Sequence, residues 1–210
     1  MSTATYRARR TSRATVRRRR LAGFVMLLGA GAIALGVAGI AGIGPLGDAV
    51  REITLPLRHE DIIRQQAADK DVDAALIAAV IYEESKFRDQ TSDAGARGLM
   101  QITPQTADYI ADKSGGIAFE QGDLASPQIN IAYGAWYLRY LKDKYEDREL
   151  AAVAAYNAGE GRVDEWVSTA GGLDLFDEAD IAFPETREYV DGVMDHRDDY
   201  RQHYDDELGY

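Results

Sequence analysis

The sequence contains no cysteine. This absence excludes disulfide-stapled scaffolds, thiolate metal sites and cysteine nucleophiles. Basic side chains are concentrated at one end: residues 1–44 hold eight arginines and no acidic residue, whereas the other 166 residues carry 16 basic and 35 acidic side chains. Because nucleic-acid binding needs a cationic face that neutralises phosphates, we expect no nucleic-acid partner. The 46% of apolar residues is typical of a globular protein.

The longest apolar run directly follows four consecutive arginines. Arg17–Arg20 form a cationic block, and residues 21–44 contain no charged side chain. A helix of this length would measure roughly 36 Å, enough to cross a bilayer core of about 30 Å. We therefore predict a basic cytoplasmic segment over residues 1–20 and a single transmembrane helix over residues 21–44. The positive-inside rule then places the rest of the chain outside the cytoplasm.

A cleaved signal peptide is the alternative interpretation of this run. Residues 30–32 (Ala-Gly-Ala) and 32–34 (Ala-Ile-Ala) both match the small-residue pattern of a cleavage site. Both triplets lie early in the run, which continues well beyond the usual length of a signal peptide. The pattern therefore favours a retained membrane anchor.

The remainder of the chain is predicted to be helical, with short connections rich in glycine. No stretch shows the alternation of polar and apolar residues that is typical of a strand. Residues 45–58 contain two prolines and predict a linker. We expect a compact all-α domain over residues 59–195. The charged residues 196–210 predict a tail that is either a solvated helix or a frayed end.

Several helix starts are marked by residues that favour the first turn. Asp73 can cap a helix over residues 74–85, since its side chain can accept from an unpaired backbone N–H group. Pro104, Pro127 and Pro184 can each begin a further helix, because proline is tolerated in the first turn. A shorter helix is predicted over residues 161–168.

Glu84 is the candidate catalytic acid. At about 100° per residue, it falls in the middle of the apolar stripe of the helix over residues 74–85, which includes Leu76 and Val80. Burial disfavours an ionised carboxyl group and raises its pKa, as a general acid at neutral pH requires. Helix geometry leaves a second interpretation open, in which the helix frays at Ser85 and Glu84 reaches water.

Four blocks in a fixed order resemble the signature of the soluble lytic transglycosylase (SLT) domain. They span about residues 60–195 and consist of Glu84-Ser85 with Ser92–Ala107 (SDAGARGLMQITPQTA), Ser126-Pro127 with Asn130-Ile131, Gly134 and Tyr137-Leu138, Ala154–Gly159 (AAYNAG), and Pro184–Arg187 (PETR) with Tyr189-Val190. The resemblance implies a multi-helix fold similar to goose-type lysozyme. Thr103 departs from the pattern, because many family members have a methionine there.

The resemblance also implies an activity. Members of this family cleave the β-1,4 bond between N-acetylmuramic acid and N-acetylglucosamine in bacterial peptidoglycan, and leave a 1,6-anhydromuramic end instead of adding water. It implies that Glu84 acts first as acid and then as base, with the substrate's N-acetyl group in place of a second carboxylate. The expected partners are glycan strands and the bacterial cytoplasmic membrane, with the catalytic domain in the periplasm or cell wall.

Five further residues are candidates for substrate binding. The resemblance places Ser92 near the N-acetyl group, Tyr156 at the reaction centre and Glu185 along the cleft. The amide of Gln101 can form hydrogen bonds with a sugar or with Glu84. The sequence pattern is consistent with Tyr189 lining the groove or packing in the core. An ordinary structural role is open for Gln101, Tyr189 and Glu185, such as a helix-dipole contact for Glu185.

Other polar residues are expected to have no catalytic role. Glu83 is interpreted as a charge on a solvated face, and Asn157 as a C-terminal capping residue. His59, His196 and His203 lack metal-ligand spacing, so we expect no metal and no cofactor. Two alternatives to the transglycosylase stay open, namely a goose-lysozyme-like hydrolase that uses water and a non-catalytic peptidoglycan-binding scaffold.

Overall fold

The computed structural model describes residues 44–115 and 119–210, and it divides into two units after Thr54. The first unit contributes one described helix, α2 (Gly44–Thr54). The predicted cytoplasmic segment and the predicted transmembrane helix over residues 21–44 lie outside the described residues, except for Gly44. Among the helices that are described, none combines the length and the hydropathy that a membrane span requires.

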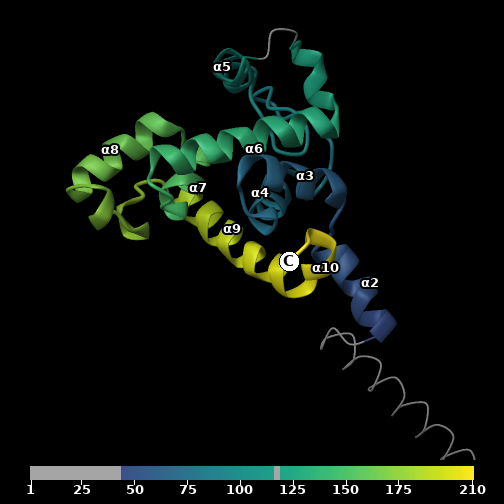
Figure 1. Ribbon diagram of the computed structural model, residues 1–210. Coiled ribbons are helices and arrows are strands. Elements are labelled where there is room, and N and C mark those ends of the chain that lie inside the picture. Colours follow the sequence, from purple (N-terminus) through teal and green to yellow (C-terminus); the bar gives the residue numbers. More distant parts are fainter. Residues whose placement is uncertain (1–43, 116–118) are drawn as a thin grey trace, which may run out of the picture. The chain divides into compact units, whose positions relative to one another are not determined.

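The second unit, Leu55–Tyr210, is built from helices and short 3-10 helices (Figure 1). In chain order they are α3 (Glu60–Lys70), α4 (Ala74–Ser85), α5 (Pro104–Ser114), η1 (Gln121–Ala125), α6 (Pro127–Lys144), α7 (Glu149–Ala158), α8 (Glu160–Ala170), η2 (Leu173–Leu175), η3 (Glu178–Asp180), α9 (Pro184–His203) and α10 (Asp205–Leu208). Extended pairing within the described part of this unit is limited to isolated bridges of Arg97 with Thr91 and Ile102. The predicted all-α class is confirmed.

Helix α4 forms the centre of the core because it is apolar on every side. All residues from Ala74 to Ile81 are buried, as expected of a helix without a polar face. Asp73 caps it as predicted, since its Oδ1 accepts from the backbone N–H of Ala75 at 3.0 Å. Helices α3, α6 and α9 pack against α4 (Figure 1). Glu84 therefore lies in the last turn of the most buried helix.

Helix α7 is the second apolar element of the core. Residues Ala151–Ala155 are buried, and α7 packs against α6, α8 and α9. Gly159 is both the C-cap of α7 and the N-cap of α8, so no separate connection lies between the two helices. Helix α8 (Glu160–Ala170) is consequently longer than the predicted helix over residues 161–168.

The C-terminal residues belong to the folded domain. Residues 196–210 were predicted as a solvated helix or a frayed end. They are helical, since α9 continues to His203 and α10 follows it, but they are not solvated throughout, because three of their side chains are buried. Tyr200 in α9, Tyr204 between the two helices and Leu208 in α10 are all buried. Polar and charged residues fill the positions between them, so the sequence does not reveal their burial.

The predicted linker over residues 45–58 also has regular structure. Helix α2 occupies its first part, and the backbone after α2 is bound by two tyrosines. The hydroxyl group of Tyr200 donates to the carbonyl oxygen of Pro56 at 2.7 Å, and that of Tyr204 donates to Leu55 at 2.8 Å. The globular domain therefore begins at Leu55 rather than at residue 59.

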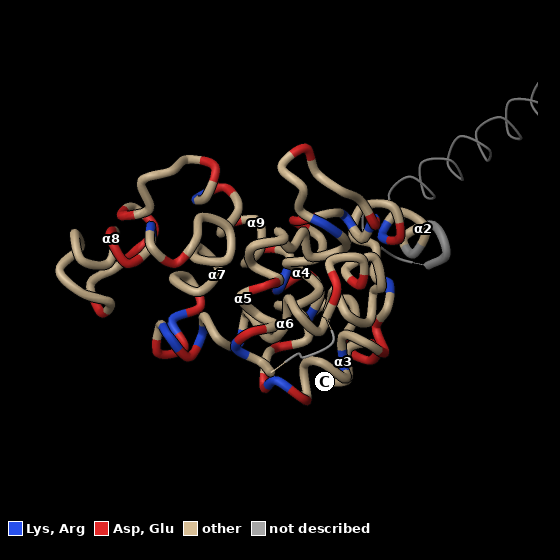
Figure 2. Tube along the Cα trace, turned by 90° about the horizontal axis from the view of Figure 1, so that it is seen from above, with Lys and Arg blue, Asp and Glu red and all other residues tan. Residues whose placement is uncertain are grey.

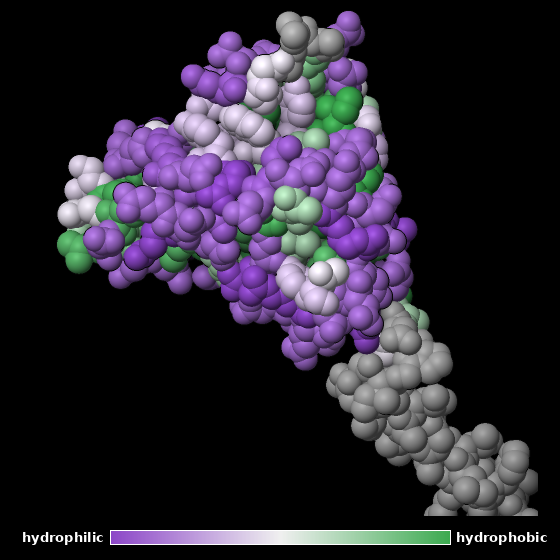
Figure 3. Space-filling model, viewed as in Figure 1, coloured by the Kyte–Doolittle hydropathy of each residue, from purple (hydrophilic) through white to green (hydrophobic). Residues whose placement is uncertain are grey.

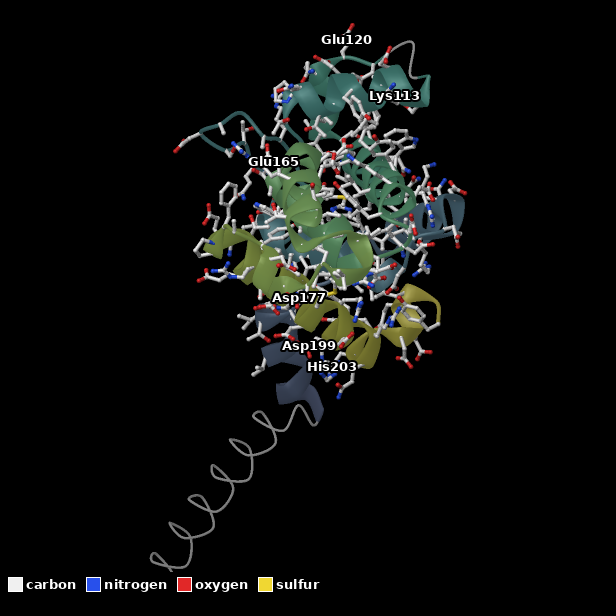
Figure 4. All side chains as sticks on the ribbon, turned by 90° about the vertical axis from the view of Figure 1, so that its left-hand side faces the viewer. Lys113, Glu120, Glu165, Asp177, Asp199 and His203 are labelled. Atoms are coloured by element: carbon white, nitrogen blue, oxygen red, sulfur yellow. The ribbon has the colours of Figure 1, made fainter. Side chains whose placement is uncertain are left out.

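The outside of the domain is polar and predominantly acidic. Aspartate and glutamate residues are spread around the outside of the trace, with fewer basic residues between them (Figure 2). The face seen in Figure 3 is mostly hydrophilic, with apolar residues in small separate patches. Asp199 and His203 mark the end of α9 in the side-chain view, and His203 is exposed (Figure 4). An anionic ligand would find little attraction on this surface.

Candidate active site

A pocket of about 300 Å³ lies at the C-terminal end of α4. Its lining comes from α4, α5, α6, the end of α7 and the segment before α5, and consists of Glu84, Gln101, Ile102, Thr103, Thr106, Tyr137, Tyr156, Asn157, Ala158 and Gly159. Of these described lining residues, Glu84 alone carries a carboxyl group. The other side chains are uncharged, and apart from the aliphatic Ile102 they are amides, hydroxyls, aromatic rings or small groups, which suits an uncharged polar ligand.

Glu84 lines this pocket from the last turn of α4, where its side chain is half-buried. Burial raises its pKa to about 7, and the negative charge of Glu83 acts in the same direction. The hydroxyl group of Tyr189, on α9, donates to Glu84 Oε1 at 2.8 Å and opposes this shift. With a pKa near neutrality, Glu84 can both donate and accept a proton under the conditions in which most enzymes work.

Tyr189 is therefore the direct partner of the candidate acid. The sequence left this residue either in the groove or in the core, and the structure places its hydroxyl on the carboxyl group of Glu84. Burial and the nearby negative charge of Glu84 raise the pKa of Tyr189 well above its usual value, so its phenol keeps the proton. Tyr189 can donate to Glu84 in either state of the carboxyl group.

Tyr156 lines the pocket, but its hydroxyl group is committed elsewhere. It donates to the backbone oxygen of Met100 at 3.0 Å, and its ring lies 5.6 Å from the ring of Tyr137. Burial raises the pKa of Tyr156 well above its usual value. The hydroxyl group that contacts Glu84 is therefore that of Tyr189, and not that of Tyr156.

Gln101 lies in the pocket wall on a tight turn. Its φ of 45° is in the left-handed region, and its Nε2 donates to the backbone oxygens of Gly98 at 2.8 Å and Gln90 at 3.0 Å. The buried Asn130 supports the same turn. Its Oδ1 accepts from Met100 N at 2.8 Å, and its Nδ2 donates to Arg97 and Leu124. The turn presents Gln101 to the pocket in a fixed position.

Three of the predicted binding residues, Tyr189, Ser92 and Glu185, are absent from the described pocket lining. Ser92 Oγ accepts from the backbone N–H of Ala96 at 3.0 Å and closes a turn within the loop after α4. Glu185 is exposed in the first turn of α9, where a carboxylate suits the helix dipole. Their contacts with substrate stay predictions.

Some lining residues were missed from the sequence. Asn157 was expected to cap α7, but Gly159 is the C-cap, and Asn157 Oδ1 accepts from Thr186 Oγ1 of α9 at 2.8 Å. Thr106 lines the pocket from α5 and shares a hydrogen bond with Thr103 at 2.8 Å. The signal for Asn157 was its place directly after Tyr156, at the end of a buried helix.

Glu83 is not the solvated charge that was expected. Its side chain is 18% exposed, and it contacts Lys86 and His196. His196 likewise faces the α4–α9 interface instead of water. Within residues 44–115 and 119–210, no group of three or more histidine, aspartate and glutamate side chains could hold a metal ion.

Comparison with known proteins gives a consistent set of relatives. The soluble lytic murein transglycosylase of Salmonella typhimurium is 36% identical over 171 residues, covering 77% of this chain and 25% of that protein. The protein of the same name from Escherichia coli K12 is 34% identical over 163 residues, covering 75% and 25%. Membrane-bound lytic murein transglycosylase F of Pseudomonas fluorescens is 35% identical over 115 residues, covering 51% and 22%. The chain thus spans about a quarter of the length of these relatives.

Solved structures show the same likeness. The 70 kDa soluble lytic transglycosylase from Escherichia coli matches with a TM-score of 0.68 and 31% identity, over 75% of this chain and 26% of that one. An inactive mutant of lytic transglycosylase Slt from Pseudomonas aeruginosa matches with a TM-score of 0.67 and 32% identity, over 74% and 26%. The family model described as "Transglycosylase SLT domain" matches residues 61–176, more than half of the chain. The chain therefore belongs to the transglycosylase SLT domain family.

Proposed function

We propose that this protein is a peptidoglycan lytic transglycosylase in which Glu84 is the single general acid and base. One observation carries the proposal: a carboxyl group with a pKa of about 7 lines a pocket in which no other described lining residue is acidic. Most glycosidases need two carboxyl groups, the second as nucleophile or as base for a water molecule. The names and the 31–36% identity of the relatives support the proposal.

The first step breaks the bond between N-acetylmuramic acid and N-acetylglucosamine. Protonated Glu84 donates its proton to the glycosidic oxygen while the bond from that oxygen to C1 of the muramic acid breaks. The departing sugar leaves with a free 4-hydroxyl group. The carbonyl oxygen of the substrate's own N-acetyl group then bonds to C1 and takes up the positive charge, so no protein nucleophile is needed.

The second step closes the anhydro ring and restores the enzyme. Glu84, now a carboxylate stabilised by the hydroxyl group of Tyr189, accepts the proton of the muramic 6-hydroxyl group. The 6-oxygen attacks C1, and the bond from C1 to the N-acetyl oxygen breaks. Glu84 is again protonated, and no water is consumed.

Recognition of the glycan is proposed to depend on hydrogen bonds and aromatic contacts rather than on charge. The chain is acidic overall, with a formal net charge of −11. Tyr137 and Tyr156 supply rings to the pocket, and Gln101 and Asn157 supply amide groups. Tyr137 continues into a row of aromatic rings on α6, since its ring lies 6.1 Å from that of Tyr140, which stacks on Trp136 at 5.6 Å.

The test of the proposed reaction is the chemical nature of its products. Isolated peptidoglycan is incubated with the purified full-length chain in detergent, and the soluble fragments are analysed by mass spectrometry. We expect anhydromuramic ends, which are lighter than hydrolytic products by one water molecule and cannot be reduced by borohydride. Reducing ends would instead assign the chain as a goose-lysozyme-like hydrolase, and undigested peptidoglycan would favour a non-catalytic scaffold.

We further propose that residues 21–44 are a retained membrane anchor with the SLT domain on the extracytoplasmic side. The eight arginines within residues 1–20 support this orientation, and some relatives are named as membrane-bound. In bacterial cells, the full chain should stay with the membranes during carbonate washing and dissolve in detergent. Proteases added to spheroplasts should degrade its C-terminal domain. Release by carbonate, or a mature N-terminus near residue 35, would favour a cleaved signal peptide.

A further inference from the structure

Glu83 lies between α4 and α9 beside the contact of Glu84 with Tyr189. Its Oε1 is 2.7 Å from Nδ1 of His196, which also lies 2.6 Å from the backbone oxygen of Gly192 and so serves two acceptors. Its Oε2 is 3.2 Å from Nζ of Lys86. His196 lies two helical turns after Tyr189 on α9, and its ring packs on Tyr82 with centroids 4.3 Å apart. Glu83 is thus fixed between two helices rather than free in solvent.

Gly192 provides the space for this contact. A Cβ atom at this position would lie 2.9 Å from Glu83 Oε1, closer than side chains normally tolerate. Glycine in the interior of a helix costs about 1 kcal/mol relative to alanine, and Gly192 lies near the middle of α9. The helix therefore carries an unfavourable residue at the point where the carboxyl group of Glu83 approaches it.

We infer that Glu83, held by His196 against Gly192, is a positioning residue for the proposed reaction and acts electrostatically on Glu84, the residue that follows it in α4. This inference rests on the proposed function of Glu84. Glu83 does not line the described pocket, so it acts through Glu84 and not on the substrate.

The electrostatic surroundings of Glu83 are consistent with this role. The titratable and charged groups that face it from α4 are Tyr82, Glu84 and Lys86, and those from α9 are Tyr189, His196 and Tyr200. Lys86 is 45% exposed, so water screens its positive charge. After burial, the charge of Glu83 is the remaining influence that raises the pKa of Glu84.

The central experiment compares Glu83→Gln with the wild type over a range of pH. Glutamine keeps the size of the side chain and its contact with His196 but removes the charge. Since kcat/KM reports the protonation of free enzyme, its alkaline limb should move to lower pH. We expect kcat/KM at pH 8 to fall by about threefold to tenfold and to stay within about twofold at pH 5.5. Tyr189→Phe should move the limb in the opposite direction, because the hydroxyl group of Tyr189 favours the ionised form of Glu84.

Glu188→Gln is the matched control. Glu188 is exposed on α9, next to Tyr189, and does not contribute to the pKa shift of Glu84. Its removal changes the net charge by the same amount and should leave the pH profile in place. An equal displacement in both variants would assign the effect to net charge and overturn the inference, as would an unchanged profile in Glu83→Gln.

Gly192→Ala tests the geometry while keeping the charge. The added methyl group should push the carboxyl group of Glu83 away from α9, and alanine favours the helix, so the fold should persist. We expect a displacement of the alkaline limb in the same direction as in Glu83→Gln. A stable Gly192→Ala protein with a wild-type profile would contradict the positioning role.

A readout without substrate separates this inference from the proposed function. The carboxyl carbon of Glu84 can be titrated by NMR in the full-length chain and in each variant. A lower titration midpoint in Glu83→Gln would support the inference even if Glu84 proved to be dispensable for cleavage. An unchanged midpoint would overturn it even if Glu84 proved to be the catalytic acid.

Discussion

Glu84→Gln should release soluble fragments from peptidoglycan at least about 1,000-fold more slowly than the wild type, because the amide can neither donate the first proton nor accept the second. The substitution keeps the size of the side chain and an oxygen that can accept from Tyr189. The pocket should therefore still bind glycan strands. The measurement combines the rate of fragment release with co-sedimentation of the variant on insoluble peptidoglycan.

The same variant should gain stability at alkaline pH. The pKa of Glu84 is raised from 4.5 to about 7 in the folded state, so its contribution is fully present below pH 4.5 and is lost as the pH rises through 7. Above that pH the wild type has to ionise a buried carboxyl group, which glutamine avoids. The free energy of unfolding of Glu84→Gln should exceed that of the wild type by roughly 1–3 kcal/mol at pH 8, with little gain at pH 4.5.

Two results would contradict this account of Glu84. Undiminished turnover in Glu84→Gln together with complete loss in Glu83→Gln would make Glu83 the acid. A stability difference that is the same at both pH values would show that Glu84 is not held protonated by its surroundings. Both measurements are made on variants that have been shown to fold. A loss of turnover therefore reflects the missing proton donor and not an unfolded protein.

Gly98→Ala should unfold or severely destabilise the domain. Gly98 has a φ of 76°, and a Cβ atom there would lie 2.1 Å from Asn130 Nδ2 and 2.7 Å from the backbone oxygen of Leu124. Asn130 cannot move away without losing its hydrogen bonds to Arg97 and Met100. The clash and the left-handed backbone together should cost roughly 3 kcal/mol or more. Chemical denaturation monitored by circular dichroism measures this loss.

Gly95→Ala is the control that isolates the backbone strain. Gly95 has a φ of 83°, but nothing lies within 4 Å of its ideal Cβ position. It should cost only about 1–2 kcal/mol, the usual penalty for a left-handed residue with a side chain. Equal destabilisation by Gly95→Ala and Gly98→Ala would show that close packing against Asn130 contributes nothing to the pocket wall.

The features that the sequence predicted correctly are those that depend on neighbouring residues. The cap at Asp73, the helix that follows it and the place of Glu84 at the end of an apolar helix all arise from the local residue pattern. A run of eight buried apolar residues leaves α4 only one place in the fold, which is the centre. Glu84, in the last turn of α4, therefore lies at the edge of the core, and this could be predicted without knowing any contact between distant residues.

The features that were missed depend on contacts between distant segments. Tyr189 and Glu84 are 105 residues apart, so nothing local indicates that their side chains meet. The contact of Glu83 with His196 has the same origin, because both residues look solvated within their own charged surroundings. Composition was similarly misleading for the C-terminal residues. They are mostly charged, but a few buried tyrosines among them hold this segment in the folded domain.

Contacts made by Arg201 and Tyr210 determine which part of the chain could be moved into another protein as a folded unit. Arg201 and Tyr210 both contact Asp73, and the hydroxyl group of Tyr210 accepts from Ala75 N at 2.9 Å, at the start of the helix that carries Glu84. A fusion partner or affinity tag joined directly to Tyr210 would disturb these contacts at the N-terminal end of α4. An engineered cassette should therefore run from Leu55 through Tyr210 and carry any appended sequence on a long spacer.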